Sequence, residues 1–273
     1  NECYANCITP NPCVECNKKI KFGLLYKKAL ELGCFYVSTG HYAKTEYSEK
    51  YKRWVITKAT SRKKDQTYVM YKVEPELVEH MMFPLANYEN KDEIRKIADE
   101  AGLVNVAHKS DSEDICFIPD NDYKKFLRET YGVNSIEGDI VDRNGRVLGK
   151  HKGLYGYTVG QRRGLGIANA VPLFVTGFNR EKNQLIVGEA DDLLKDSMIC
   201  YDINLLLIDK LEYPTRVMIK TRYTQQEIPG IVEMYGEDKF KVIFDDPQPR
   251  ITPGQSAVFY VDDILFGGGK ILG

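Results

Sequence analysis

The 273-residue sequence has no apolar run long enough to cross a bilayer, and its first residues lack the pattern of a secretory signal. It has no charge bias either. Its 38 Lys and Arg balance 39 Asp and Glu, so any contact with nucleic acid has to come from local basic patches. No long-period repeat or low-complexity segment is present. These absences argue against a membrane partner, and we expect a cytoplasmic protein of two or three domains.

Cysteine, by contrast, is not scarce. The sequence has seven, an odd number, and four of them lie within the first sixteen residues, as Cys3, Cys7, Cys13 and Cys16. A chain without a secretory signal is expected in a reducing compartment, where cysteines commonly serve metal or redox chemistry. Because Cys-x-x-Cys is shared by metal and redox sites, the spacing leaves open both a zinc or disulfide framework and a reactive thiol.

The segment before residue 18 gives Cys16 a rigid setting. Two prolines restrict φ, so we predict a stiff, non-helical turn from Pro10 to Pro12 and a helix over residues 18–33 that Asn17 caps. Cys16 would then lie at the helix N-terminus beside several lysines, where the helix dipole and the positive charges favour the thiolate. The apolar face of this helix is predicted at Ile20, Leu24, Leu25, Ala29 and Leu32.

Two polar stretches follow in the next fifty residues. The first, residues 38–41, ends a short apolar strand, which is where an open α/β sheet collects its ligands. On its own, however, His41 is better explained as a packed, hydrogen-bonded histidine. In the second, residues 62–64 are three cations that fit phosphate neutralisation, and the amide of Gln66 can hydrogen-bond a base or a ribose. A solvated loop is the alternative for this second stretch.

Further along, Cys116 lies between apolar residues and after an acidic run. Taken alone it is better explained as a buried structural cysteine, but paired with Cys16 it would provide a second sulfur for transfer chemistry. Between the polar stretches and Cys116, Asn90 with Glu93 resembles a capping box and predicts a helix that ends at Ala101.

The second half of the sequence has the pattern of β structure. Asn144-Gly145 is the turn signal of a hairpin over residues 138–149, and a second hairpin is predicted over residues 174–188. Between them, residues 150–166 are rich in glycine, tyrosine and cations, a composition that fits RNA contact and a flexible loop equally well. Short alternating strands after residue 193 predict a small barrel or sandwich.

Five motifs occur in order along the chain, at residues 9–17 with 20–22, 38–43, 64–68, 112–118 and 160–166. In sequence and in order they resemble the motifs of the tRNA-specific 2-thiouridylases, and the likeness runs over essentially the whole chain. The resemblance implies a partial α/β domain of the adenine-nucleotide α-hydrolase-like (PP-loop) kind at residues 1–130. A central, small mixed, β-rich tRNA-binding domain would follow at residues 131–194, and a C-terminal β-barrel at residues 195–273.

The resemblance also implies a sulfurtransferase that puts sulfur on C2 of the wobble uridine of tRNA. ATP activates that carbon by adenylation, and a donor protein supplies the sulfur as a persulfide. Cys116 would carry the persulfide and Cys16 would attack it, which leaves a Cys16–Cys116 disulfide. The other residues that match family sites are, for the target base, Asn11, Pro12 and Cys13; for the nucleotide, Gly40; and for the tRNA, His41, Asp65, Gln66, Thr67, Arg222, Tyr223 and Gln255.

Two departures from the family pattern affect the chemistry. The ATP-binding loop Ser-Gly-Gly-x-Asp-Ser-Ser is absent from this sequence, so we expect that an N-terminal portion is missing and that this chain alone does not adenylate uridine. Second, Cys13 stands where some members have aspartate, so Cys13, Cys16 and Cys116 become candidate ligands of an iron–sulfur cluster. The alternatives left open are a zinc- or iron–sulfur-binding RNA module without catalysis and a dithiol oxidoreductase that uses Cys13 and Cys16. Cys3 and Cys7 have no assigned role.

Overall fold

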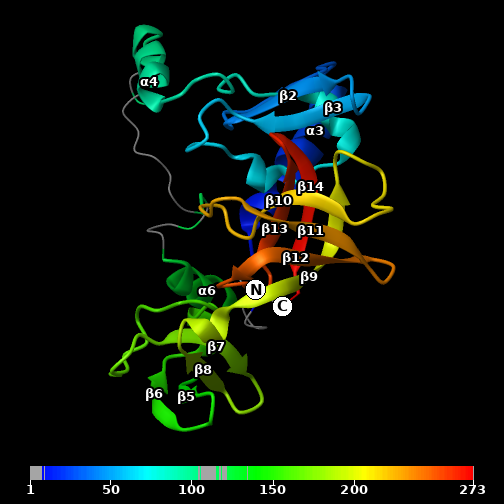
Figure 1. Cartoon of the computed structure of the whole chain (residues 1–273). Helices are drawn as coiled ribbons and strands as arrows, with labels where there is room; N and C mark the ends of the chain where they lie inside the picture. Colours follow the sequence, from blue (N-terminus) through cyan, green and yellow to red (C-terminus); the bar gives the residue numbers. More distant parts are fainter. Residues whose placement is uncertain are drawn as a thin grey trace.

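The computed structural model describes residues 8, 10–103, 105, 115, 116, 118, 122–133 and 135–272. Figure 1 shows the strands of a C-terminal barrel in the middle, a hairpin with the first helix above it, and a smaller β unit below. The expected sequence of an α/β part, a small mixed central unit and a β-barrel is therefore confirmed. Within the described part, no helix combines the length and the apolarity needed to span a bilayer.

Six antiparallel strands form the barrel, in the order β13-β10-β11-β12-β9-β14, and pairing of β14 with β13 closes it. Alternate side chains point inward, so that Ile219, Val232 and Phe259 are fully enclosed. The strands are β9 (Lys195–Leu205), β10 (Thr215–Lys220), β11 (Ile228–Tyr235), β12 (Lys239–Gln248), β13 (Ser256–Val261) and β14 (Ile264–Ile271).

A hairpin from the N-terminal part extends the same sheet. Its strands are β2 (Ala43–Ser48) and β3 (Arg53–Lys58), and β3 joins β14 through Thr57 and Ile264. One hydrophobic cluster consequently contains residues of both parts, with Val14 and Phe22 in the same core as Val258 and Tyr260. The α/β part is thus built onto the barrel rather than merely linked to it.

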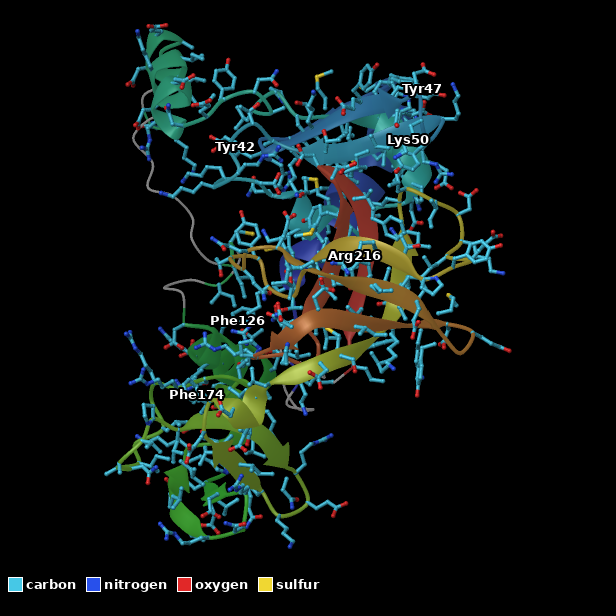
Figure 2. All side chains as sticks on the ribbon, viewed as in Figure 1. Tyr42, Tyr47, Lys50, Phe126, Phe174 and Arg216 are labelled. Atoms are coloured by element: carbon cyan, nitrogen blue, oxygen red, sulfur yellow. The ribbon has the colours of Figure 1, made fainter. Side chains whose placement is uncertain are left out.

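The central unit is a four-stranded sheet in the order β6-β5-β8-β7. Both predicted hairpins are present, and the parallel pairing of β5 with β8 joins them around a core of Ile140, Val175 and Leu185. The elements are α6 (Tyr123–Tyr131), β5 (Gly138–Asp142), β6 (Val147–His151), η5 (Leu154–Gly156), β7 (Phe174–Asn179), β8 (Gln184–Gly188) and η6 (Asp191–Leu193). The Arg250 guanidinium lies 5.9 Å from the ring of Phe174, a contact between the barrel and the central unit. Figure 2 labels Phe174 in the central unit.

The first helix differs from its prediction. It is continuous from residue 12 to residue 31 as α2 (Pro12–Cys16), the π-helical η1 (Asn17–Leu24) and α3 (Leu25–Glu31). Three residues of the predicted apolar face, Ile20, Leu24 and Leu32, are 55%, 65% and 69% exposed, so that part of the prediction is wrong. Phe22 is buried in their place, because the wider π-helical turn changes which side chains face the core.

Short elements complete the N-terminal part. They are β1 (Val37–Ser38), η2 (Thr67–Met70), η3 (Pro75–His80), β4 (Met81–Met82) and α4 (Lys91–Glu100). Strands β1 and β4 pair in parallel and form a sheet of only two strands. The predicted cap of α4 is confirmed: Asn90 Oδ1 accepts from the backbone N–H groups of Asp92 and Glu93, and the Asn90 amide donates to Glu93.

Candidate active site

Cys13 and Cys16 lie in the first turns of the opening helix. Asn11 is extended (φ −111°, ψ 92°), and the helix begins at Pro12, where a missing N–H costs nothing and φ is already helical. The prediction that the helix starts at Lys18 with Asn17 as its cap is therefore wrong. It is Cys13, and not Cys16, that follows the first helical residue, so the N-terminal dipole acts most directly on Cys13.

The π-helical segment η1 places the next polar residues. Its hydrogen bonds reach five residues back, as from the Leu25 N–H to the Ile20 carbonyl. Gly23 permits this turn, because a Cβ there would lie 2.7 Å from the Lys18 carbonyl oxygen. Asn17 is buried, and its Nδ2 donates to the Val69 carbonyl (3.0 Å), which fixes the helix against η2. Single π-helical turns are frequent at functional sites.

Lys21, which this segment positions, meets His41. Lys21 Nζ is 3.1 Å from His41 Nε2, and Thr39 Oγ1 is 2.8 Å from His41 Nδ1. An ammonium can only donate, so Nε2 accepts and the ring proton sits on Nδ1, from which it is donated to Thr39. Burial, followed by the Lys21 charge, lowers the pKa of His41 to about 4. The imidazole is therefore neutral at physiological pH.

Two other cysteines and Lys21 act electrostatically on Cys13. Burial raises the pKa of Cys13, Cys116 raises it further, the positive charge of Lys21 lowers it, and Cys16 raises it again. Residues far apart in sequence thus act electrostatically on one sulfur, and both cysteines that the sequence singled out, Cys16 and Cys116, are among them. The predicted Cys16–Cys116 disulfide is not supported, since both are free thiols here, as is Cys13.

A metal centre finds no support among these residues. In the described part of the chain, no group of three or more His, Cys, Asp or Glu side chains is arranged to hold a metal ion. The described side chains therefore give no support to the candidate iron–sulfur cluster. Cys3 and Cys7, the other members of the proposed zinc set, lie outside the described residues, as does Thr9 of the first motif.

An ion network fixes the cysteine helix to the barrel. Glu15 accepts from Lys270 (3.2 Å) and Lys72 (3.4 Å), and both lysines also pair with Asp202. Partial burial opposes the charge on Glu15, but hydrogen bonds from Lys19 and Lys270 and the nearby Lys72 charge lower its pKa to about 2. Because Glu15 lies between Cys13 and Cys16 in sequence, the network fixes the position of both thiols.

The second polar motif turns most of its side chains inward. Asp65 is buried and accepts from the Ala59 N–H (2.9 Å) and the Thr67 hydroxyl (2.5 Å). Burial raises the pKa of Asp65, while the hydrogen bonds from Thr67 and Ala59 lower it. Gln66 closes the loop, since its Oε1 accepts from the Tyr42 N–H (2.9 Å). These side chains hold the loop in shape behind the basic stretch at residues 62–64.

Two barrel residues face this region. The ring of Tyr223 packs edge-on against Tyr68, and burial, followed by the charges of Asp65 and Cys13, raises the Tyr223 pKa. Tyr223 is therefore within electrostatic reach of the thiol group. Arg222 donates to the Thr252 hydroxyl (2.6 Å) and to the Val159 carbonyl (3.2 Å), so it bridges the barrel to the central unit.

At two predicted positions, the described contacts give no structural reason for the residue type. A Cβ on Gly40 would meet only Leu85, at an ordinary 3.8 Å, so the protein interior does not require glycine there. The Asn11 side chain makes no capping hydrogen bond although it directly precedes the helix. Gln255 lies at the start of β13, where its carbonyl accepts from the Ile271 N–H (2.8 Å).

Comparison with known proteins agrees with this geometry. Three family models match in order: a tRNA methyl transferase HUP domain over residues 1–120, a tRNA methyl transferase PRC-barrel domain over residues 124–189 and an aminomethyltransferase beta-barrel domain over residues 195–271. The chain is 47% identical to the tRNA-specific 2-thiouridylase MnmA of Clostridioides difficile and 44% identical to that of Carboxydothermus hydrogenoformans. Each match spans 263 residues, 96% of this chain and 72% of the relative.

The chain belongs to the tRNA-specific 2-thiouridylase family. Within that family, two features of this thiouridylase site were missing from the sequence interpretation. Lys21 stands inside a recognised motif, but only the fold shows that it contacts His41 and acts on Cys13. Glu15 gave no signal at all, because its partners Lys72 and Lys270 lie far away in the sequence.

Proposed function

We propose that this chain carries the sulfur-transfer site of a tRNA 2-thiouridylase, in which sulfur from a persulfide replaces the oxygen on C2 of the wobble uridine. The observation that supports the proposal is that Cys16, Cys116 and Lys21 all act electrostatically on Cys13, which in turn acts on Tyr223. The C2 oxygen is a poor leaving group, and the co-substrate ATP supplies adenylation, so that AMP leaves instead. The free thiols and the tRNA substrate fit an enzyme of the cytoplasm.

The sulfur steps use two cysteines. Cys116 accepts the terminal sulfur from a persulfide carrier protein. The Cys16 thiolate attacks Sγ of Cys116, the sulfur–sulfur bond of the persulfide breaks, and hydrosulfide leaves as a Cys16–Cys116 disulfide forms. The two Sγ atoms are oxidised as the transferred sulfur is reduced to sulfide, which adds to C2 as AMP departs. A dithiol reductant restores both thiols for the next turnover.

The surrounding residues orient these sulfurs. Lys21 holds a positive charge beside the thiol group and stabilises anionic sulfur. A neutral His41 accepts from Lys21 and so fixes the ammonium without adding a competing charge. The Glu15 network keeps the helix that carries Cys13 and Cys16 against the barrel during attack.

The tRNA and nucleotide contacts follow the same surface. We assign the target uracil to Asn11, Pro12 and Cys13 at the helix start and the nucleotide to Gly40, where the backbone can be approached closely. The tRNA residues are assigned as His41, Asp65, Gln66, Thr67, Arg222, Tyr223 and Gln255. Since His41, Asp65 and Thr67 are buried, they act by shaping the loops that contact RNA. A flipped base in an anticodon loop is accessible to such a site.

The test follows one sulfur atom. The chain is incubated with a cysteine desulfurase and cysteine as sulfur source, and mass spectrometry locates the added sulfur. Cys116 is expected to gain one sulfur in the wild type and in Cys16→Ser. On standing, the wild type releases sulfide and forms the Cys16–Cys116 disulfide, whereas Cys16→Ser retains the persulfide.

Cys34→Ser serves as the matched control, because Cys34 is an exposed thiol that does not act on Cys13. It should load and release sulfur as the wild type does. Loading on Cys34 instead of Cys116, or sulfide release that does not depend on Cys16, would overturn the assignment of the two roles.

A further inference from the structure

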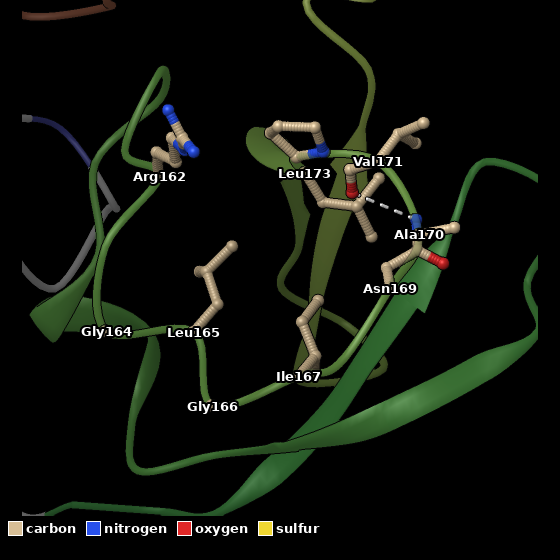
Figure 3. A pocket seen from close by; sticks show the side chains of 10 residues that line it. Arg162, Gly164, Leu165, Gly166, Ile167, Asn169, Ala170, Val171 and Leu173 are labelled. Carbon is tan, nitrogen blue, oxygen red and sulfur yellow. Dashed lines mark hydrogen bonds between the residues drawn. The ribbon is translucent and has the colours of Figure 1, made fainter.

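The central unit has a groove that the sulfur chemistry does not use. Its volume is about 380 Å³, within the range of small-ligand sites, and it lies in the loop between η5 and β7. Figure 3 shows Arg162 on one wall and Val171 and Leu173 on the other, with Leu165 and Ile167 between them. The cation at one end and the apolar floor of the groove complement the anionic phosphate and the flat base of a nucleotide.

The loop is held in shape before any ligand arrives. Gln161 accepts from the Thr158 N–H (3.1 Å) and donates to the Arg163 carbonyl (2.9 Å). On the floor, Ile167 packs so closely on Gly149 that a Cβ there would lie 2.7 Å from it. On the far wall, the Asn169 amide donates to the Val171 carbonyl (3.2 Å). A groove formed in advance loses little entropy on binding.

The charges of the groove favour an anion. None of its lining residues is acidic. Gly164 (φ +77°) and Gly166 (φ +67°) adopt the left-handed conformation that favours glycine, so the groove loop depends on glycine at both positions. Within the described chain, neither Arg162 nor the nearby Arg222 and Arg250 is paired with a carboxylate. Uncompensated arginines of this kind attract a polyanion.

The groove is also close to the proposed RNA path. Arg222 and Thr252 both donate to the Val159 carbonyl, and Arg162 follows Val159 by three residues. Three residues span at most about 11 Å, so the groove begins within that distance of the barrel contact. An RNA strand that contacts Arg222 can therefore also contact Arg162.

We propose that this groove binds one unstacked nucleotide of the tRNA, with its phosphate on Arg162 and its base against Leu165, Ile167 and Val171. The inference rests on the proposed tRNA substrate and adds a contact on the central unit, away from the cysteines. The phosphate supplies salt-dependent affinity, and the apolar floor supplies a contribution that salt does not screen. The groove thus holds the tRNA while its wobble base is at the thiols.

The experiment measures tRNA binding by the chain over a range of salt concentrations. Arg162→Ala should weaken binding about tenfold at low salt and reduce the salt slope by about one unit, as expected for one lost phosphate contact. Val171→Ser should weaken binding several-fold at every salt concentration and leave the slope unchanged. Arg163→Ala is the matched control: the neighbouring arginine does not line the groove, and its loss should change binding less than twofold.

Equal effects of Arg162→Ala and Arg163→Ala would show only a diffuse basic surface and overturn the proposal, as would an unchanged affinity in Arg162→Ala and Val171→Ser. The persulfide assay on the same variants keeps the two proposals apart. Loss of tRNA affinity with normal sulfur loading supports the groove. Failure of sulfur loading in the wild type, with the groove effects intact, would overturn the sulfur-transfer role alone.

Discussion

The barrel and the N-terminal α/β part differ in which of their side chains are buried. The barrel encloses inward-facing apolar residues such as Ile219, Val232 and Phe259, and its one cysteine, Cys200, is fully buried. The opening helix leaves Ile20, Leu24 and Leu32 more than half exposed, while its polar residues are the ones that are fixed, by the contacts of Glu15 and Lys21. The barrel thus has an apolar interior of its own, and the opening helix packs Val14 and Phe22 against its outer face while Glu15 and Lys21 make polar contacts.

The largest expected difference between the two regions is in stability. Phe259→Ala removes a fully enclosed ring from the barrel and should lower the free energy of unfolding by about 3–5 kcal/mol. Leu24→Gln, on the exposed face of the helix, should change it by less than about 0.5 kcal/mol, since the helix propensities are similar. Urea denaturation measures both. A comparable cost for Leu24→Gln would show that this face is covered and that the contrast is false.

Sequence patterns predicted the regular parts of the fold for identifiable reasons. The Asn144-Gly145 turn and the period-two alternation of the barrel strands are local signals, and the structure contains both. The Asn90 cap is equally local. The helix start at Pro12 and the π-helical turn were both missed. The π-helical turn depends on the close approach of Gly23 to the Lys18 carbonyl, which is visible only in the folded structure.

A smaller change in folding stability is expected at acidic pH. The pKa of His41 falls from an ordinary 6.5 to about 4 on folding, so the unfolded chain binds more protons in this range. Stability is therefore complete above pH 6.5 and is lost as the pH falls toward 4, by about 2–3 kcal/mol. Urea denaturation of the whole chain between pH 7 and 4.5 measures this loss.

His41→Gln tests the cause, because its Oε1 can still accept from Lys21 but does not titrate in this range. The variant should lack the acid-dependent loss, whereas His80→Gln, on η3 of the same part, should retain it. An unchanged pH profile in His41→Gln would mean that other groups account for the acid sensitivity.

The candidate site, like the fold, has features that the sequence predicted and features that only the structure revealed. Cys16 and Cys116 were identifiable because they stand in recognisable motifs, and both act electrostatically on Cys13. Lysine charges beside Cys16 were expected, but the contact of Lys21 with His41 and the role of Glu15 were not. Each depends on a partner that the fold brings in from another element: His41 for Lys21, and Lys270 for Glu15. Motif residues identify the chemistry, and long-range contacts decide how it is tuned.

The smallest expected effect, and the most local, concerns the reactivity of the thiols. Lys21→Met removes the charge that lowers the Cys13 pKa, so at a fixed mildly alkaline pH a smaller fraction is thiolate. Alkylation of Cys13 by iodoacetamide, measured by tandem mass spectrometry, should slow several-fold, and the pH midpoint of the alkylation rate should rise.

Two lysine variants serve as controls. Lys21→Arg should largely restore the alkylation rate of Cys13, and Lys28→Met, which removes an exposed lysine of α3, should leave that rate unchanged. Cys200 should stay unlabelled in every variant, because burial raises its pKa and shields it. Equal rates in Lys21→Met and the wild type would mean that Lys21 serves His41 and the fold, but not the sulfur.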